Sequence, residues 1–375
     1  MTTALIIITA AYVALLLLRS YLALSYARTF PAGQTCTLPP DTLTIAQAIL
    51  SGDPLLESRL AANLKTLPNQ RFIWLLDEDD KEAQRISEKL QTAHLQIEIC
   101  PPCPEATNPK LWKLNHAVPL LETPLLCVLD DDTTLSESSA AELMEAAASH
   151  TVATGLPCYL DSGDMPSGML SQFVNNNSVF TYLGTSKLLP PFTLNGMGYA
   201  MRRTELSALG NFQPILHELT DDLALATLVL RQGGSIHQAM APLRVQTDVR
   251  NLSHYMQLMH RWYVFTLLLL RKQRLPVQLF IFLLHGLPPL LLLGLVIVSA
   301  ATASPLTVLL VFILRLLVIT SIQRRFFGPG FHRPLLSILS ELMQPFHLIH
   351  ALACRTIRWR TRLYRVRDTH DFTAA

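Results

Sequence analysis

Three groups of carboxylates are the residues of this sequence best suited to chemistry. They are Asp77-Glu78-Asp79-Asp80, Asp130-Asp131-Asp132 and the pair Asp221-Asp222. Adjacent carboxylates repel one another, and a divalent cation relieves that repulsion. Mg²⁺ and Mn²⁺ prefer oxygen ligands and commonly bridge carboxylates to a substrate diphosphate. The triple Asp therefore predicts such a metal, although on these residues alone a solvated acidic turn with Ser136 as helix cap fits equally well.

The elements that position these groups follow from the hydrophobic pattern. Short apolar runs rich in β-branched residues predict strands, and segments with helical spacing lie between them. An alternation of this kind predicts an α/β fold with a parallel sheet that is covered on both faces and binds ligands at the carboxyl ends of its strands. The first two acidic groups directly follow two of these strands. The predicted strands are 43–49, 71–76, 95–99 and 125–129, and the predicted helices are 54–66, 80–92, 110–121 and 136–149.

Asp221 and Asp222 open a further helical stretch, residues 221–231. Thr220 could cap that helix, and acidic residues in a first turn suit the helix dipole, so the pair also has a purely structural explanation. Ahead of it, Asn195-Gly196-Met197-Gly198 is a flexible segment suited to close approach of a ligand to the backbone. His260-Arg261-Trp262 stands immediately before a long apolar region.

The composition indicates a membrane protein. Half of the 375 residues are hydrophobic, 15% are charged and the mean hydropathy is +0.30, whereas a soluble chain carries about a quarter charged residues. A net charge of +2 excludes a general nucleic-acid binder, and six cysteines do not form a disulfide scaffold. Spans are predicted at about 277–300 and 305–323, after a first span at 4–24. A cleaved signal peptide is the alternative for the first span, but it lacks a basic segment before the apolar run.

The loop charges define one orientation. Arginine and lysine follow the first span, precede the second and follow the third, which predicts that residues 28–275 are cytosolic. Residues 334–354 are apolar, but arginines flank them on both sides, so we expect a re-entrant or surface-lying helix. The basic tail that follows is either a clamp for lipid headgroups or an inert terminus. The expected location is a bacterial cytoplasmic membrane, with several spans.

In this order, the features resemble the ceramide glucosyltransferase family of membrane-bound GT-A glycosyltransferases. That family has a first Asp, a DxD-like strand end, a third Asp, and a (Gln/Arg)-x-x-Arg-Trp motif beside the membrane. The resemblance covers roughly residues 40–368, but Leu258 stands where the motif has Gln or Arg. The main matches are Asp77, Asp130 with Asp132, Asp222, and Arg261-Trp262; smaller ones are Asp53-Pro54, Asn108-Pro109-Lys110, Gly155-Leu156-Pro157, Trp359-Arg360-Thr361, Tyr364-Arg365 and Arg367.

The resemblance implies a cytosolic GT-A domain, which is Rossmann-like with a mostly parallel sheet, together with transmembrane helices. The expected divisions are a transmembrane anchor at 1–27, the GT-A domain at 28–250, an interfacial helix with the Arg-Trp motif at 251–275, two transmembrane helices at 276–323, and a re-entrant or interfacial helix with the basic tail at 324–375.

The resemblance further implies inverting transfer of a sugar of the glucose or N-acetylglucosamine type from a UDP-sugar to a lipid hydroxyl such as that of ceramide. Diacylglycerol-type lipids and hopanoids are equally suitable acceptors. On this view Asp222 is the general base, and Asp130 and Asp132 hold Mg²⁺ or Mn²⁺ as a Lewis acid against the leaving UDP.

The donor and acceptor contacts follow from the same resemblance. Asp77 orients the uridine, Lys110 contacts the nucleotide or its diphosphate, and Arg261 adds positive charge near the pyrophosphate. Trp262 lines the acceptor entrance or serves as an interfacial anchor. We expect His260, or else Gln257, to supply the hydrogen-bond donor that Leu258 lacks.

Two other functions fit part of the sequence. One is a polyprenyl-phosphate or polysaccharide glycosyltransferase, although processive synthases carry more spans and keep the Gln of the last motif. The other is a catalytically degenerate membrane scaffold, which the intact aspartates argue against. Cys100-Pro101-Pro102-Cys103 has redox-motif spacing, but no helix begins at Cys100 and two cysteines do not complete a zinc site. Arg315 lies inside a predicted span, where headgroup contact and snorkelling toward the cytosol are both open.

Overall fold

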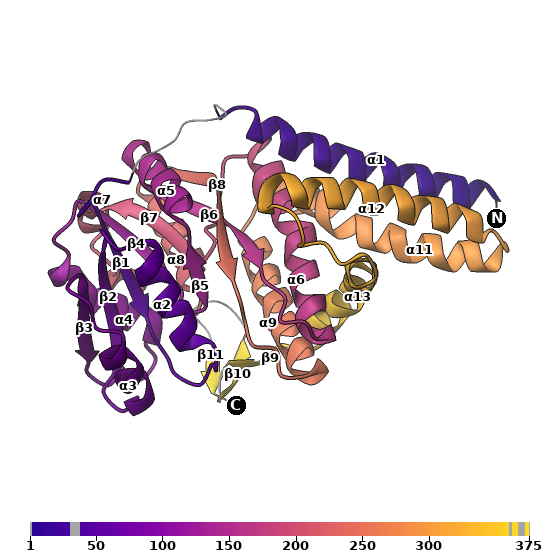
Figure 1. Ribbon diagram of the computed structural model, residues 1–375. Helices are drawn as coiled ribbons and strands as arrows, with labels where there is room; N and C mark the ends of the chain where they lie inside the picture. Colours follow the sequence, from indigo (N-terminus) through magenta and orange to yellow (C-terminus); the bar gives the residue numbers. More distant parts are fainter. Residues whose placement is uncertain (1, 31–37, 360–361, 367–371, 375) are drawn as a thin grey trace. The chain divides into compact units, whose positions relative to one another are not determined.

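The computed structural model describes residues 2–30, 38–359, 362–366 and 372–374 (Figure 1). The chain folds as two compact units. The sheet unit comprises residues Pro31–Cys158 and Pro190–Asp248, and the helical unit comprises Met1–Phe30, Tyr159–Leu189 and Val249–Ala375. Residues 159–189 therefore leave the sheet unit and pack with the apolar helices.

The sheet unit contains one eight-stranded mixed sheet in the order β3-β2-β1-β4-β7-β6-β8-β5. The half made of β3, β2, β1 and β4 is parallel, as predicted, whereas β7 runs antiparallel to β4 and β6, and β5 runs antiparallel to β8. The strands are β1 (Leu43–Ala48), β2 (Arg71–Asp77), β3 (Leu95–Cys100), β4 (Leu125–Leu129), β5 (Thr133–Leu135), β6 (Val152–Tyr159), β7 (Gly198–Arg202) and β8 (Ile236–Val245).

Helices cover both faces of this sheet, as the alternating pattern predicted (Figure 1). Side chains along a strand alternate between two cores, so that Phe72 and Trp74 pack on one face and Ile73 and Leu75 on the other. One face is covered by α2 (Leu56–Thr66), α3 (Lys81–Lys89) and α5 (Glu137–Ser149), and the other by α4 (Pro109–Ala117), the short helices η1 (Val118–Leu120) and η3 (Gln213–Ile215), α7 (Arg203–Ala208) and α8 (Asp221–Arg231).

The helix caps explain where these helices begin. Ser136 accepts a hydrogen bond from the Ser139 N–H at the start of α5, as predicted. Asn108 caps α4 in the same way, with Pro109 at the first helical position, where the missing N–H costs nothing. Thr220 is the N-cap residue of α8, but its side chain makes no capping hydrogen bond. The first turn of α8 contains the acidic residues Asp221 and Asp222.

The helical unit is built around three long apolar helices that lie side by side, α1, α11 and α12 (Figure 1). Helix α13 packs on α6, α9 and α11 and leads into a small antiparallel sheet. The elements are α1 (Thr2–Ala27), α6 (Met165–Ser178), η2 (Val179–Gly184), α9 (Leu252–Arg271), α10 (Leu275–Ile281), η4 (Phe282–Gly286), α11 (Leu287–Ala301), α12 (Pro305–Phe327), α13 (Pro334–Ala353), β9 (Thr356–Trp359), β10 (Arg362–Val366) and β11 (Phe372–Ala374).

In the part of the chain that the structure describes, four helices are long and apolar enough to cross a membrane, which indicates a membrane protein. They are Thr3–Ala27, Leu275–Ala301, Pro305–Phe327 and Pro334–Ala353. The first three contain the predicted spans. The fourth, α13, has the lowest hydropathy of the four and a proline inside the helix, Pro345.

Helix α13 has a polar face turned inward and an apolar face turned outward. The outward residues are Leu335, Phe346, Ile349 and Leu352, all more than half exposed, whereas the buried residues include Ser337, Ser340, Glu341, Gln344 and His347. This distribution is the reverse of that on a surface helix of a soluble protein. The outward face is therefore suited to contact with lipid.

Arg315, the charge inside the third predicted span, has a partner within the helical unit. Its Nε donates to Glu341 Oε2 at 2.7 Å, and its other nitrogens donate to Ser337 Oγ at 2.8 Å and to the Ser337 carbonyl at 3.0 Å. The Tyr12 hydroxyl donates to the other oxygen of Glu341 at 3.2 Å. Arg315 is 1% exposed, so it joins α12 to α13 and α1 internally and is not placed as a headgroup contact.

Replacing Arg315 with Met is expected to destabilise the helical unit, because it leaves the Glu341 carboxylate buried without its cation. Breaking a buried ion pair by removing one partner costs about 3–5 kcal/mol. The double variant Arg315→Met/Glu341→Met removes both charges and is expected to recover most of the loss. Thermal unfolding of the purified protein in detergent measures both. Equal unfolding temperatures for the wild-type protein and the Arg315→Met variant would contradict this account of the pair.

Candidate active site

The predicted carboxylates of the sheet unit gather where the parallel strands end. Asp77 is the last residue of β2, and Asp130 follows β4, whose neighbour β1 lies between the two. Asp221 and Asp222 occupy the first turn of α8. Carboxyl ends of parallel strands meet at one edge of a sheet, and this is where α/β folds bind ligands.

Lys110 joins two of these carboxylate groups. Its Nζ lies 2.6 Å from Asp130 Oδ1 and 2.7 Å from Asp221 Oδ2, and it donates to the Gly196 carbonyl at 3.0 Å. Burial opposes the charged ammonium, but the two carboxylates outweigh it and hold the pKa of Lys110 well above its usual value. The Lys110 ammonium thus forms ion pairs with two carboxylates and donates a hydrogen bond to a backbone carbonyl.

A second lysine on α4, Lys113, was not identified from the sequence. Its Nζ lies 2.6 Å from Asp77 Oδ2 and donates to the Ile49 carbonyl at 2.8 Å, and the side chain is 3% exposed. Residues three apart share a helix face, so Lys110 and Lys113 both point at the carboxyl edge of the sheet. The sequence signal that could have identified Lys113 is its spacing of three residues from Lys110, on a helix that follows a strand end.

Asp222 differs from its neighbour Asp221 in having no ion pair within the described ranges. One oxygen accepts a hydrogen bond from the Leu223 N–H at 2.7 Å. Burial, followed by the negative charge of Asp221, raises the pKa of Asp222 to about 7. Gly196 lies beside it so closely that a Cβ at that position would be 3.3 Å from Asp222 Oδ2. Asp222 is thus the unpaired carboxylate of the two.

The three aspartates after β4 have different surroundings. Asp131 accepts a hydrogen bond from the Leu50 N–H at 2.9 Å. Asp132 accepts from the Thr133 and Thr247 hydroxyls, each at 3.1 Å. Burial, reinforced by the neighbouring carboxylate of Asp131, raises the pKa of Asp132 to about 6, and burial raises that of Asp130 to about 6 despite Lys110. Lys110 pairs with Asp130, whereas Asp132 accepts hydrogen bonds from neutral hydroxyls, and a divalent cation would neutralise the remaining negative charge of this turn.

The donor set of Asp130 and Asp132 fits a divalent cation that is bound together with a diphosphate. Among the residues that the structure describes, no group of three or more His, Cys, Asp or Glu side chains is placed to hold a metal ion. Mg²⁺ is commonly held by one or two carboxylates together with substrate phosphates, and it keeps several waters. Two carboxylates from one turn are sufficient for that arrangement.

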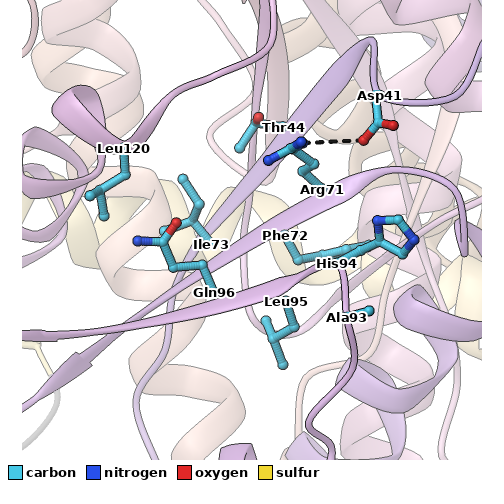
Figure 2. Close-up of a pocket in the computed structure, with 10 residues that line it drawn as sticks. All are labelled: Asp41, Thr44, Arg71, Phe72, Ile73, Ala93, His94, Leu95, Gln96 and Leu120. Carbon is cyan, nitrogen blue, oxygen red and sulfur yellow. Dashed lines mark hydrogen bonds and ion pairs between the residues drawn. The ribbon is translucent and has the colours of Figure 1, made fainter.

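A separate cavity of about 310 Å³ lies at the opposite ends of the parallel strands (Figure 2). It is lined by residues near the starts of β1, β2 and β3, among them Thr44, Arg71 and His94. Arg71 pairs across it with Asp41 at 3.2 Å. Because the catalytic candidates lie at the carboxyl ends, this cavity is not part of the same site.

The Arg-Trp motif lies on α9 in the helical unit. His260 is 6% exposed, its Nε2 bonds to the Thr356 carbonyl at 3.1 Å, and its ring centroid is 4.3 Å from that of His350. Trp262 packs edge-to-face against Tyr159 at 5.8 Å.

The neighbours of the motif are placed as follows. Leu258 is buried, and Arg261 is half-buried. The Gln257 side chain donates to Ser253 Oγ at 3.5 Å. These residues and the carboxylates belong to different units, so their joint action stays a prediction.

The Cys100-Pro101-Pro102-Cys103 segment does not support a redox site. Both cysteines are free thiols. Burial raises the pKa of Cys100 to about 11 and also raises that of Cys103, which disfavours the reactive thiolate. Asp53, one of the smaller motif matches, forms an ion pair with Arg59 at 2.5 Å and so has a structural role.

The sequence comparison decides the family. Residues 1–371 match the family described as glycosyl transferase family 21. The chain belongs to this family. The predicted membership of the ceramide glucosyltransferase group is therefore confirmed, and family 21 membership makes the protein a glycosyltransferase. No curated protein matches the chain in sequence.

A solved structure confirms the fold of this family 21 protein. The mannosyltransferase PcManGT from Pyrobaculum calidifontis, in complex with GDP-Man and Mn2+, is similar over 94% of this chain and 97% of its own, with a TM-score of 0.53 and 14% identity. At that identity the likeness shows the GT-A fold alone. GalNAc-T7 with UDP, GalNAc and Mn2+ matches 60% of this chain and 48% of its own, with 10% identity and a TM-score of 0.42, too low to support an argument.

Proposed function

We propose that this family 21 protein is an inverting glycosyltransferase that moves a sugar of the glucose or N-acetylglucosamine type from a UDP-sugar to the hydroxyl of a membrane lipid such as ceramide. The observation that supports it best is the division between Asp221, paired with Lys110, and the unpaired Asp222, at the carboxyl edge of a GT-A sheet. Among the described residues, four helices are long and apolar enough to cross a membrane, where a lipid acceptor would lie.

The donor side of the proposal uses the strand ends. Asp77, held by Lys113, orients the uridine, and Asp130 and Asp132 hold Mg²⁺ or Mn²⁺. When bound, the cation acts as a Lewis acid that neutralises the charge developing on the leaving diphosphate. Arg261 adds positive charge near the pyrophosphate, for which a planar guanidinium is suited. The Mn2+ bound in the solved mannosyltransferase supports a divalent cation here.

The acid–base step needs one carboxylate. Asp222 takes the proton of the acceptor hydroxyl as that oxygen attacks the anomeric carbon from the face opposite UDP. A general base works best when its pKa lies near the operating pH, and the pKa of Asp222 at about 7 meets that condition. A single displacement inverts the anomeric centre and requires no covalent nucleophile.

The acceptor side of the proposal uses the helical unit. Trp262, packed against Tyr159, lines the entrance for the lipid, and His260 replaces the donor that Leu258 cannot provide. The apolar residues exposed on α13 give this unit a lipid-facing surface. We propose the same five functional divisions of the chain as in the sequence analysis: 1–27, 28–250, 251–275, 276–323 and 324–375.

Nucleotide release by the purified full-length protein in nanodiscs tests the proposal. UDP-glucose, UDP-N-acetylglucosamine and GDP-mannose are supplied separately, with ceramide, diacylglycerol, hopanoid or polyprenyl phosphate in the bilayer. We expect UDP release that requires one of the hydroxyl lipids, and no GDP release. Release that depends only on polyprenyl phosphate would support the alternative glycosyltransferase function instead.

The proposed topology has residues 28–275 on the cytosolic side and α13 not crossing the bilayer. Cysteine labelling of His370→Cys, in a background without the six native cysteines, measures the side on which the tail lies. We expect labelling from the cytosolic side, because the arginines before and after α13 favour that side. Labelling only from the opposite side would show that α13 is a fourth span.

A further inference from the structure

Helix α4 carries two lysines that together contact three of the site's carboxylates. Lys113 pairs with Asp77, and Lys110, one turn earlier, pairs with Asp130 and Asp221. Asp132 and Asp222 add further carboxylates in this part of the sheet unit, and a nucleotide diphosphate adds more negative charge. The buried ammonium of Lys113 and the half-buried ammonium of Lys110 therefore reduce the repulsion that the site would otherwise exert on its donor.

The two lysines differ in what they hold. Lys113 joins the end of β2 to the backbone after β1, through Asp77 and the Ile49 carbonyl. Lys110 joins the end of β4 to the first turn of α8 and to the backbone at Gly196. Gly196 is also the residue whose backbone closely approaches Asp222. Lys110 thus contacts both groups that flank Asp222: the carboxylate of Asp221 and the backbone carbonyl of Gly196.

The start of α4 is fixed to the segment before α8. The Asn108 N–H donates to the Leu216 carbonyl at 2.7 Å, and its side-chain amide donates to the Glu218 and Leu219 carbonyls at 3.0 and 3.2 Å. Asn108 at the same time caps α4. Lys110 therefore reaches Asp221 from a helix whose position relative to α8 is already set, so its contact can determine how the first turn of α8 presents its two carboxylates.

We infer that Lys110 is a positioning residue that divides the tasks of the adjacent aspartates: it holds Asp221 against Asp130, and so leaves Asp222 as the carboxylate free to act as base. The inference rests on the proposed function, in which Asp222 is that base. It assigns Lys110 to the proton-transfer half of the reaction and its helical neighbour Lys113 to the donor-binding half. The contact of Lys110 with the nucleotide or its diphosphate, expected from the sequence, is the alternative that the kinetics of lysine variants distinguish.

Kinetics of matched lysine variants test the inference. Lys110→Met is expected to lower kcat by about 30-fold or more while the donor Kd, measured by calorimetry, changes less than about threefold. Lys113→Met is the control from the same helix face, and it is expected to raise the donor Kd by about tenfold with a smaller effect on kcat. Lys110→Arg, whose guanidinium can bridge two carboxylates, should restore kcat to within about fivefold of wild type.

A double-mutant cycle separates this role from a general loss of structure. The losses in kcat from Lys110→Met and Asp221→Asn should not add, because both remove the same contact. Unfolding temperatures in detergent show that each variant is folded. If Lys110→Met raises the donor Kd and leaves kcat unchanged, Lys110 is a donor ligand and the inference is wrong; additive losses would also overturn it. A wild-type protein without lipid-dependent UDP release would instead refute the proposed function.

Discussion

Transfer by the Asp222→Asn variant is expected to be about 10²–10⁴-fold slower than wild type, the usual effect of losing a general base. Asn keeps the shape of the side chain but cannot accept the proton of the acceptor hydroxyl. Donor binding should remain nearly intact, because Asp222 forms no ion pair in the described parts of the chain and is not among the residues proposed to bind UDP. Initial rates of glycolipid formation and calorimetric titration with the UDP-sugar measure the two quantities.

Asp221→Asn is the matched control for this prediction. It alters the adjacent carboxylate, which pairs with Lys110 at 2.7 Å, and is expected to slow transfer by about 30-fold, as Lys110→Met does, and so by less than Asp222→Asn. If Asp221→Asn is the inactive variant and Asp222→Asn is active, the roles of the two aspartates are reversed.

Removal of divalent cations is expected to have the second large effect. Excess EDTA should reduce transfer by at least about 100-fold, and Mg²⁺ or Mn²⁺ should restore it, because the leaving diphosphate would otherwise lack a Lewis acid. Asp132→Ala should weaken binding of the nucleotide sugar. Asp131→Ala is the control within the same acidic turn, since its carboxylate accepts a hydrogen bond from the Leu50 backbone, and it should weaken donor binding less. Undiminished transfer in excess EDTA would contradict the metal assignment.

The parallel half of the sheet was predictable from local patterns. Strands β1 to β4 are short apolar runs separated by helices with regular spacing, and each predicted element is present. The acidic groups at 77 and 130 were therefore expected at strand ends, which is where the fold places them. The antiparallel half was not predicted, because β6 is buried at every position and pairs with strands far along the chain. A continuous apolar run carries no period that identifies its partner.

The contacts inside the site were less accessible to sequence reasoning. Asp221 and Asp222 are chemically identical neighbours in the sequence, and their different contacts, above all the ion pair of Asp221 with Lys110, distinguish them in the fold. The pairing of Lys113 with Asp77 joins residues 36 positions apart, and that of Arg315 with Glu341 joins two helices. Such pairs depend on how the elements pack, whereas motif spacing reflects only the order of residues in the chain.

Identification of the product tests most directly whether the protein transfers a sugar from a UDP-sugar to a membrane lipid. The purified full-length protein is incubated with UDP-glucose or UDP-N-acetylglucosamine, Mg²⁺ and a bacterial lipid extract, and new glycolipids are identified by mass spectrometry, with Asp222→Asn as the matched control. We expect a lipid heavier by one hexose or N-acetylhexosamine residue, formed by the wild-type protein and absent with the variant. Sugar transferred only to a polyprenyl phosphate, or equal product from both proteins, would contradict it.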